Sequence, residues 1–217
     1  MRLSRFWNGI LDLLFPPRCV SCSSDEDWWC AECRSNVERV YTEVVFEDLD
    51  GMCVLGYYHD PILRAAIQGL KFHGMSVLRP SIESFIASRG LGGGIPEHEP
   101  LAIQALPTSP TRKRARGFDQ AELLMELLHD SGFADFYAVD LLVRGEGSGM
   151  AQARLPDPKL RLANVADVFR LKLGAVPEAV LLVDDVITSG ATMCEAARLL
   201  RAHGAKHVYG FALALGA

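Results

Sequence analysis

The sequence VLLVDDVITSGAT (residues 180–192) joins a short apolar run to two acidic residues and a turn of small and hydroxyl residues. The apolar run predicts a buried strand at 180–183, and the pattern beyond the turn predicts a helix at 191–203. A strand that leads into a helix is typical of a parallel α/β sheet. We therefore expect Asp184 and Asp185 to lie at the carboxyl edge of such a sheet, where α/β proteins bind ligands.

The turn in this stretch has the chemistry of a phosphate-binding site. Consecutive backbone N–H groups at a helix N-terminus suit a phosphate dianion, and hydroxyl side chains add donors. Small residues let the backbone approach closely. The two aspartates can accept hydrogen bonds from vicinal ribose hydroxyls, directly or through Mg²⁺. The competing interpretation is an acidic strand end that only caps a helix. The candidate phosphate-binding residues are Thr188, Ser189, Gly190, Ala191 and Thr192, and the candidate catalytic residues are Asp184 and Asp185.

Strand-like and helix-like patterns alternate through the preceding and following sequence. Further strands are predicted at 52–58, 101–106, 139–143 and 207–214, and further helices at 61–74, 80–89 and 119–129. Asp119 is the expected N-cap of the last helix. Residues 144–160 lack any period and predict a long loop. The alternation predicts an α/β domain over residues 41–217, with a mostly parallel sheet flanked by helices.

Residues 1–40 form a separate unit with four of the six cysteines. Cys19 and Cys22 form one C-x2-C pair, Cys30 and Cys33 form a second, and seven residues separate the pairs. Two such turns supply a tetrahedral four-thiolate shell for a structural Zn²⁺ ion. Metal binding would then supply the folding energy that so short a segment lacks. Disulfides and four unrelated buried thiols are the alternatives.

The residues before the cysteines predict an amphipathic helix. Arg2 and Arg5 precede apolar residues, as in an export signal, but no small-residue cleavage site follows before Pro16-Pro17. No apolar run approaches the roughly 18 residues of a membrane-spanning helix. We expect a cytoplasmic protein that does not span the membrane. The apolar positions at helical spacing are Leu3, Phe6, Trp7, Ile10, Leu13 and Leu14.

Composition excludes a globally basic nucleic-acid binder but allows a local basic patch. The 217 residues are 49% apolar and 23% charged, which is typical of a globular protein with a core. The net charge is −5 and the sequence pI is about 5.7. A basic loop nevertheless runs from Arg112 to Arg116. Arginine side chains there suit pyrophosphate or phosphodiester oxygens, although a solvated surface is the alternative.

Residues 180–192 resemble the 5-phosphoribosyl-1-pyrophosphate (PRPP) signature of type I phosphoribosyltransferases at every defining position. Four further motifs precede it in the chain: the paired cysteines, KFxG (71–74), RARGFDQ (114–120) and QxxLxxxxxRxxNxxxxF (152–169). Together they resemble the competence protein F family of bacteria, over nearly the whole chain. That family combines a four-cysteine zinc finger with a phosphoribosyltransferase-like domain, and is implicated in natural transformation and in the handling of incoming single-stranded DNA.

The resemblance also implies roles for individual residues. It places PRPP and Mg²⁺ at Asp184, Asp185 and the 188–192 turn. Asp119 stands where the family usually has Asn, which puts a negative charge beside the proposed anion site, and Ser189 replaces a frequent Thr. The remaining ligand contacts that the resemblance implies are Arg114, Arg116 and Gln120 near the pyrophosphate, and Gln152 and Arg161 on a mobile flap.

Several functions are compatible with these features. An active phosphoribosyltransferase of nucleotide metabolism or salvage, similar to an amidophosphoribosyltransferase, would displace pyrophosphate through an oxocarbenium-like transition state. A competence factor would retain the PRPP site and bind single-stranded DNA, with Trp28 and Trp29 either stacking on bases or packing the zinc module onto the domain. An adaptor would dock other DNA-uptake proteins, such as a helicase, at the inner face of the membrane.

Overall fold

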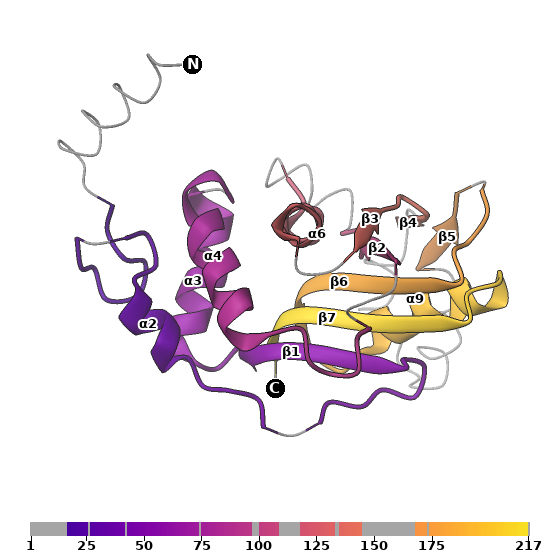
Figure 1. The fold of residues 1–217 in the computed structure, drawn as a ribbon, viewed down its shortest axis with the longest axis horizontal. Helices are drawn as coiled ribbons and strands as arrows, with labels where there is room; N and C mark the ends of the chain where they lie inside the picture. Colours follow the sequence, from indigo (N-terminus) through magenta and orange to yellow (C-terminus); the bar gives the residue numbers. More distant parts are fainter. Residues whose placement is uncertain are drawn as a thin grey trace, which may run out of the picture.

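The computed structural model describes residues 17–25, 27–41, 43–73, 75–96, 100–108, 118–132, 135–144, 168–172 and 174–216. Its centre is a five-stranded sheet in the order β1-β7-β6-β2-β3, with every neighbouring pair parallel (Figure 1). The strands are β1 (Gly51–Tyr57), β2 (Leu101–Ala105), β3 (Phe136–Ala138), β6 (Ala179–Ile187) and β7 (His207–Leu215).

Helices cover both faces of this sheet. Along β6 the side chains alternate: Leu181 and Val183 pack into one hydrophobic cluster, and Val180 and Leu182 into the other. Because both faces are buried, the strand is a continuous apolar run, as the sequence indicated. The prediction of a parallel α/β fold is confirmed. The first cluster includes residues of α3 (Pro61–His73), α4 (Met75–Arg89) and α6 (Gln120–Ser131), and the second includes residues of α9 (Ala191–Ala202).

The predicted strand at 139–143 is wrong. The chain leaves β3 after Ala138, and a new strand, β4 (Leu142–Arg144), pairs antiparallel with β5 (Phe169–Leu171) in a separate two-stranded sheet. Between them, the Leu141 N–H donates to Gln104 Oε1 at 2.6 Å. The partner strand lies 25 residues further along the chain, so a local pattern does not reveal the pairing.

The helix predicted to begin near Pro80 begins at Met75 instead, and Pro80 lies inside it. Proline inside a helix removes one backbone hydrogen bond and is normally unfavourable. Here the helix continues through it because apolar residues on both sides pack into the core. Leu78, Ile82 and Phe85 are each 0–1% exposed. Tertiary packing therefore outweighs the local preference for proline in the first turn.

The cysteine module packs against the helices on one face of the sheet. Trp29 is 1% exposed, and its ring centroid lies 4.9 Å from that of Phe85 in α4. Val20 packs close to the Cα atom of Gly69 in α3. Trp29 therefore anchors the module to the domain and is not available to stack on bases. The boundary at residue 40 stays a prediction. Within the described ranges, no helix has the length and apolar character needed to cross a bilayer.

Candidate functional site

A cavity of about 380 Å³ opens where β2 and β6 end. Asp184 and Asp185 of β6 form part of its wall, opposite the segment that follows β2. The start of α6 and the first turn of α9 complete it. The cavity therefore lies at the carboxyl edge of a parallel sheet, which is where such folds bind ligands.

The structure brings several of the predicted site residues together at this cavity. Ser189 and Ala191 are exposed in the same turn, and Gly190 is buried beneath it. Arg114, Arg116, Gln152 and Arg161 lie outside the described residues. The predicted residues that line the cavity are Gln120, Asp184, Asp185, Thr188 and Thr192.

The two aspartates have no cationic partner among the described residues. Asp184 Oδ1 accepts a hydrogen bond from the Asp185 N–H at 2.8 Å, and no described cation forms an ion pair with either carboxylate. Burial, and then the charge of Asp185, raise the pKa of Asp184 well above its usual value. A cation or a pair of ribose hydroxyls would relieve this cost. Mg²⁺ is commonly held by one or two carboxylates together with substrate phosphates.

Asp119 is a structural member of the same wall. Its carboxylate accepts from the Ala121 N–H at 3.0 Å and from the Thr108 N–H at 2.9 Å. The first bond caps α6, as predicted, and the second fixes the segment after β2. Because both oxygens are engaged, Asp119 holds two sides of the cavity in place.

Gly190 is the N-cap of α9 and has a left-handed backbone, with φ of 72°. The ring of Phe46 fills the space beside it, because a Cβ atom on Gly190 would lie 2.2 Å from a ring carbon. No side chain fits there unless the ring moves. Phe46 thereby supports the turn from below, and the turn's exposed residues face solvent and the cavity.

We expect Gly190→Ala to destabilise the protein more than the matched substitution Gly132→Ala. Gly132 also has a positive φ, of 68°, but nothing lies within 4 Å of an added Cβ atom. Gly132→Ala should lower the free energy of unfolding by about 1 kcal/mol, because its backbone conformation disfavours a side chain. Gly190→Ala should lower it by about 1–3 kcal/mol more, because the Phe46 ring must also move. Urea denaturation of both variants measures the difference, and equal losses would show that Phe46 does not support the turn.

The sequence did not single out two lining residues, Tyr58 and Arg144. Tyr58 follows β1, and Arg144 ends β4, where its guanidinium carbon lies 5.6 Å from the centroid of the Phe169 ring. Both reach the cavity only through the tertiary arrangement of separate strands. The one local signal for Arg144 was its position at the start of the loop that the sequence predicts at 144–160.

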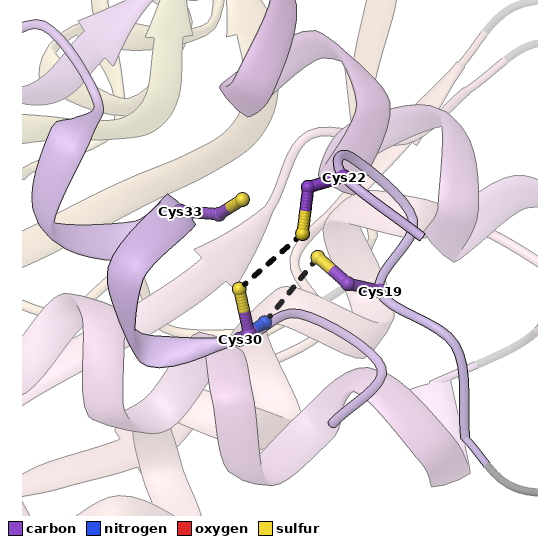
Figure 2. A group of neighbouring side chains, drawn as sticks. All are labelled: Cys19, Cys22, Cys30 and Cys33. Atoms are coloured by element: carbon purple, nitrogen blue, oxygen red, sulfur yellow. Dashed lines mark hydrogen bonds between the residues drawn. The ribbon is translucent and has the colours of Figure 1, made fainter. Parts of the chain in front are cut away.

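The four cysteines form a second candidate centre, suited to a metal ion (Figure 2). Their sulfur atoms all lie within 4.8 Å of one another, and the Sγ atoms of Cys22 and Cys30 are 3.7 Å apart. A tetrahedral zinc site with Zn–S bonds of about 2.3 Å requires sulfurs about 3.8 Å apart. The spacing therefore fits zinc. It exceeds the roughly 2 Å of a disulfide, and all the cysteines are free.

The thiols would also gain from a cation between them. A side-chain hydrogen bond with Ser24 lowers the pKa of Cys22 to about 6, whereas burial raises the pKa of Cys33 to about 12. Four thiolates in so small a volume would repel each other without a divalent ion. Residues 19–33 therefore have both the geometry and the chemistry of a structural zinc site.

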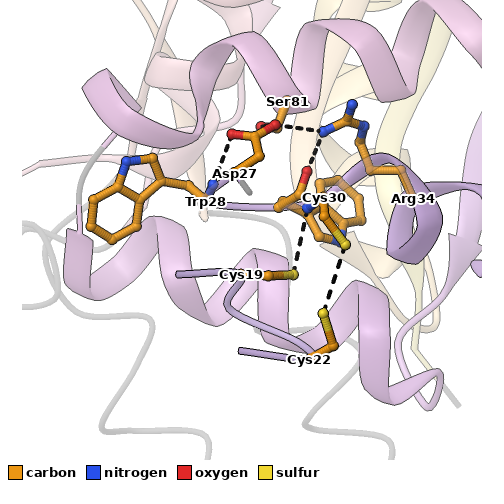
Figure 3. A network of polar contacts seen from close by, with 8 residues as sticks. Cys19, Cys22, Asp27, Trp28, Cys30, Arg34 and Ser81 are labelled. Carbon is orange, nitrogen blue, oxygen red and sulfur yellow. Dashed lines mark hydrogen bonds and ion pairs between the residues drawn. The ribbon is translucent and has the colours of Figure 1, made fainter. Parts of the chain in front are cut away.

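A polar network ties this centre to α4 (Figure 3). Asp27 Oδ2 accepts hydrogen bonds from Arg34 Nη1 at 3.0 Å and from the hydroxyl of Ser81 at 3.0 Å. Arg34 also donates to the carbonyl oxygen of Trp29. Asp27 lies between the two cysteine pairs and Ser81 lies in α4, so the network fixes the metal loop on the domain.

Comparison with known proteins relates this chain to one domain family and to several named proteins. Residues 177–215, from β6 to β7, match the family described as phosphoribosyl transferase domain. Competence protein ComFC of Streptococcus pneumoniae is 26% identical over 209 residues, covering 88% of this chain and 89% of that protein. Competence protein F of Haemophilus influenzae is 28% identical over 203 residues, covering 91% and 84%.

Two further matches cover smaller shares of this chain. DNA utilization protein YhgH of Salmonella typhi is 31% identical over 157 residues, covering 69% of this chain and 66% of that protein. A purine phosphoribosyltransferase structure from Pyrococcus horikoshii covers 76% of this chain and 90% of its own at 14% identity, with a TM-score of 0.25. So low a score supports no argument about the fold, which rests instead on the sheet topology.

Proposed function

Because this chain is a homologue of competence protein ComFC, competence protein F and YhgH and contains a phosphoribosyltransferase domain, we propose that it is a PRPP-binding protein of DNA uptake. The observation that carries the proposal is the cavity at the carboxyl edge of β6, where two aspartates without a described cationic partner adjoin a turn of small and hydroxyl residues. We place this function in the cytoplasm, at the inner face of the membrane.

In this proposal the 5′-phosphate binds the backbone N–H groups between Thr188 and Thr192, at the N-terminus of α9. The ribose hydroxyls lie against Asp184 and Asp185. Mg²⁺ would neutralise pyrophosphate charge, and the two aspartates are the described groups suited to hold it. Arg114 and Arg116 are proposed to contact the pyrophosphate, and Gln152 and Arg161 to cover the ligand.

We expect PRPP to bind the zinc-loaded protein only in the presence of Mg²⁺. Asp185→Asn should weaken binding at least about tenfold, because the amide cannot replace a charged ligand or acceptor. Glu126→Gln is the matched control, since it removes one exposed carboxylate from α6 and lines no part of the cavity. Isothermal titration calorimetry, with and without Mg²⁺, measures the affinity for PRPP of the wild-type protein and both variants. Binding that is independent of both Mg²⁺ and Asp185 would contradict the proposal.

The match to a phosphoribosyltransferase domain favours a second candidate, an active transferase of nucleotide metabolism or salvage. The lining residues would then stabilise an oxocarbenium-like sugar and the departing pyrophosphate. Incubation with PRPP, Mg²⁺ and a panel of bases distinguishes the two candidates. Pyrophosphate release that depends on a base supports the enzyme, whereas tight binding without release supports a competence factor that uses PRPP as a ligand.

Single-stranded DNA is the proposed nucleic-acid partner, bound through the basic loop at 112–116. The names of the relatives support this part of the proposal: two are called competence proteins and the third is called a DNA utilization protein. Binding through phosphate contacts weakens steeply as salt concentration rises. Replacing Arg114 and Arg116 together with Ala should therefore lower both the affinity and its salt dependence, and an unchanged salt slope would remove the loop from this role.

A further inference from the structure

A second cavity, of about 490 Å³, lies along the edge strand β1 and shares no lining residue with the first. Three segments supply its lining residues: residues 39–41 and 43–44 after the zinc module, residues within 50–55 in β1 and its approach, and residues within 89–94 at the end of α4. It therefore forms where the module, the sheet edge and the helix layer meet. Neither the phosphoribosyltransferase chemistry nor the zinc centre uses it.

Two arginines line this cavity without an acidic partner. Arg89 Nη2 donates to the carbonyl oxygen of Val37 at 2.6 Å, and Arg39 Nη2 donates to that of Ser88 at 3.4 Å. In the part of the chain that the structure describes, neither guanidinium forms an ion pair. These carbonyl contacts hold the two side chains without pairing them to a carboxylate, and the negative charge of the buried Asp60 also acts on Arg89.

Arg89 is also incompletely hydrogen-bonded. Its Nη1 atom is buried without a hydrogen-bond acceptor among the described residues, and its guanidinium carbon lies 4.9 Å from the centroid of the Phe85 ring. Burial, and then the nearby charge of Arg39, lower the pKa of Arg89. An anion in the cavity would offset the repulsion between the two guanidinium groups, both of which line it.

The acidic residues in the wall do not cancel this positive charge. Asp50 already binds Arg201 Nη2 at 2.6 Å and the Val208 N–H at 2.7 Å. Glu43 is exposed, so water screens it. Arg39 is exposed as well, so the least screened charge in the wall is that of the half-buried Arg89.

Part of the cavity wall is built from glycine. Gly93 has φ of 74° and lies so close to β1 that a Cβ atom would be 2.2 Å from the Met52 carbonyl oxygen. With Gly92 and Gly94 beside it, this wall has no side chains that would shield the backbone from a ligand. Tyr41 lines the same cavity and is 86% exposed, an unusual position for a large aromatic side chain.

We propose that this cavity is a second ligand site, which binds the phosphate group of a nucleotide between Arg39 and Arg89, with the base against Tyr41. Paired arginines offer several donors in the planar geometry that phosphate oxygens accept. An exposed aromatic ring adds a stacking surface for a base. The site goes beyond the PRPP site and does not depend on it.

Amide NMR of the full-length, zinc-loaded protein tests this proposal, because glycine signals separate the two cavities. Thymidine 5′-monophosphate should shift the amides of Gly92–Gly94 with a saturable curve, and inorganic phosphate should do so at least about tenfold more weakly, since it has no base to stack. Arg39→Gln should weaken nucleotide binding at least about tenfold. Arg64→Gln, which removes an exposed arginine from α3, should leave it unchanged.

Three results would overturn the proposal. One is movement of the Gly190 amide alone, which would place the nucleotide in the PRPP site. Another is equal affinity in Arg39→Gln and Arg64→Gln. The third is equal affinity for phosphate and nucleotide. Arg89→Lys is a second variant, which keeps the charge but removes the planar guanidinium, and it should also weaken nucleotide binding. Asp185→Asn should bind the nucleotide as the wild type does, which keeps this test separate from that of the PRPP site.

Discussion

Replacing Cys30 with Ser is expected to release the metal ion and to lower the free energy of unfolding by several kcal/mol. Cys30 is buried, and its sulfur lies 3.7 Å from that of Cys22, so its loss opens the four-thiolate shell. The effect should reach the main domain, because Trp29 packs on Phe85 and Asp27 bonds to Ser81 in α4. Zinc content per chain and urea denaturation, followed by tryptophan fluorescence, measure the two losses.

Cys194→Ser is the matched control for this experiment. Cys194 lies in α9, outside the four-cysteine cluster, so this variant should keep one zinc ion per chain. Chelation of the wild-type protein should reproduce the effect of Cys30→Ser without any change in sequence. Wild-type protein that contains no zinc, or that has the same stability with and without a chelator, would contradict a structural metal centre.

Replacing Asp184 with Asn is expected to stabilise the unliganded protein and to weaken its binding of PRPP and Mg²⁺ at least about tenfold. Asp184 Oδ1 accepts from the Asp185 N–H, and the Asn side chain can still accept this bond. The substitution removes a buried negative charge beside Asp185. Burial and the charge of Asp185 are the two largest causes of the raised pKa of Asp184. The site therefore gives up stability to keep a charge that its ligand requires.

The stability difference between the wild-type protein and Asp184→Asn should depend on pH. Because the folded-state pKa of Asp184 is raised, the wild-type protein loses stability as the pH rises from the unfolded value, about 4, through the folded value. At pH 7 the Asn variant should be the more stable of the two, and near pH 4 the difference should vanish. Urea denaturation at both pH values measures this. An Asn variant that is less stable at pH 7 would show that Asp184 is not strained in the empty site.

The sequence predicted those parts of the fold and the site that depend on local pattern. The stretch at 180–192 contains a strand, two acids, a tight turn and a helix start in order, and β6, Gly190 and α9 follow that order. Asp119 was identified as a cap because its role depends on the first turn of its own helix. The cysteine pairs were equally local, and the structure brings them within zinc-binding distance.

What the sequence could not predict depends on distant packing. Pro80 lies within a helix because Leu78 and Ile82 are buried on either side of it. The strand at 142–144 forms because β5 returns to pair with it. Tyr58 and Arg144 reach the cavity from other strands, and no local motif marks them. Trp29 anchors the cysteine module by packing against Phe85, a contact between distant parts of the chain that no local motif marks.

Hydrogen–deuterium exchange of backbone amides, with and without PRPP and Mg²⁺, tests most directly whether the turn after β6 holds the sugar phosphate. Binding should slow exchange at residues 188–192 in the wild-type protein, because these N–H groups would donate to phosphate oxygens. Asp185→Asn should show little protection there at the same ligand concentration. Tight PRPP binding that leaves exchange at 188–192 unchanged would contradict the account, because the ligand would then lie elsewhere.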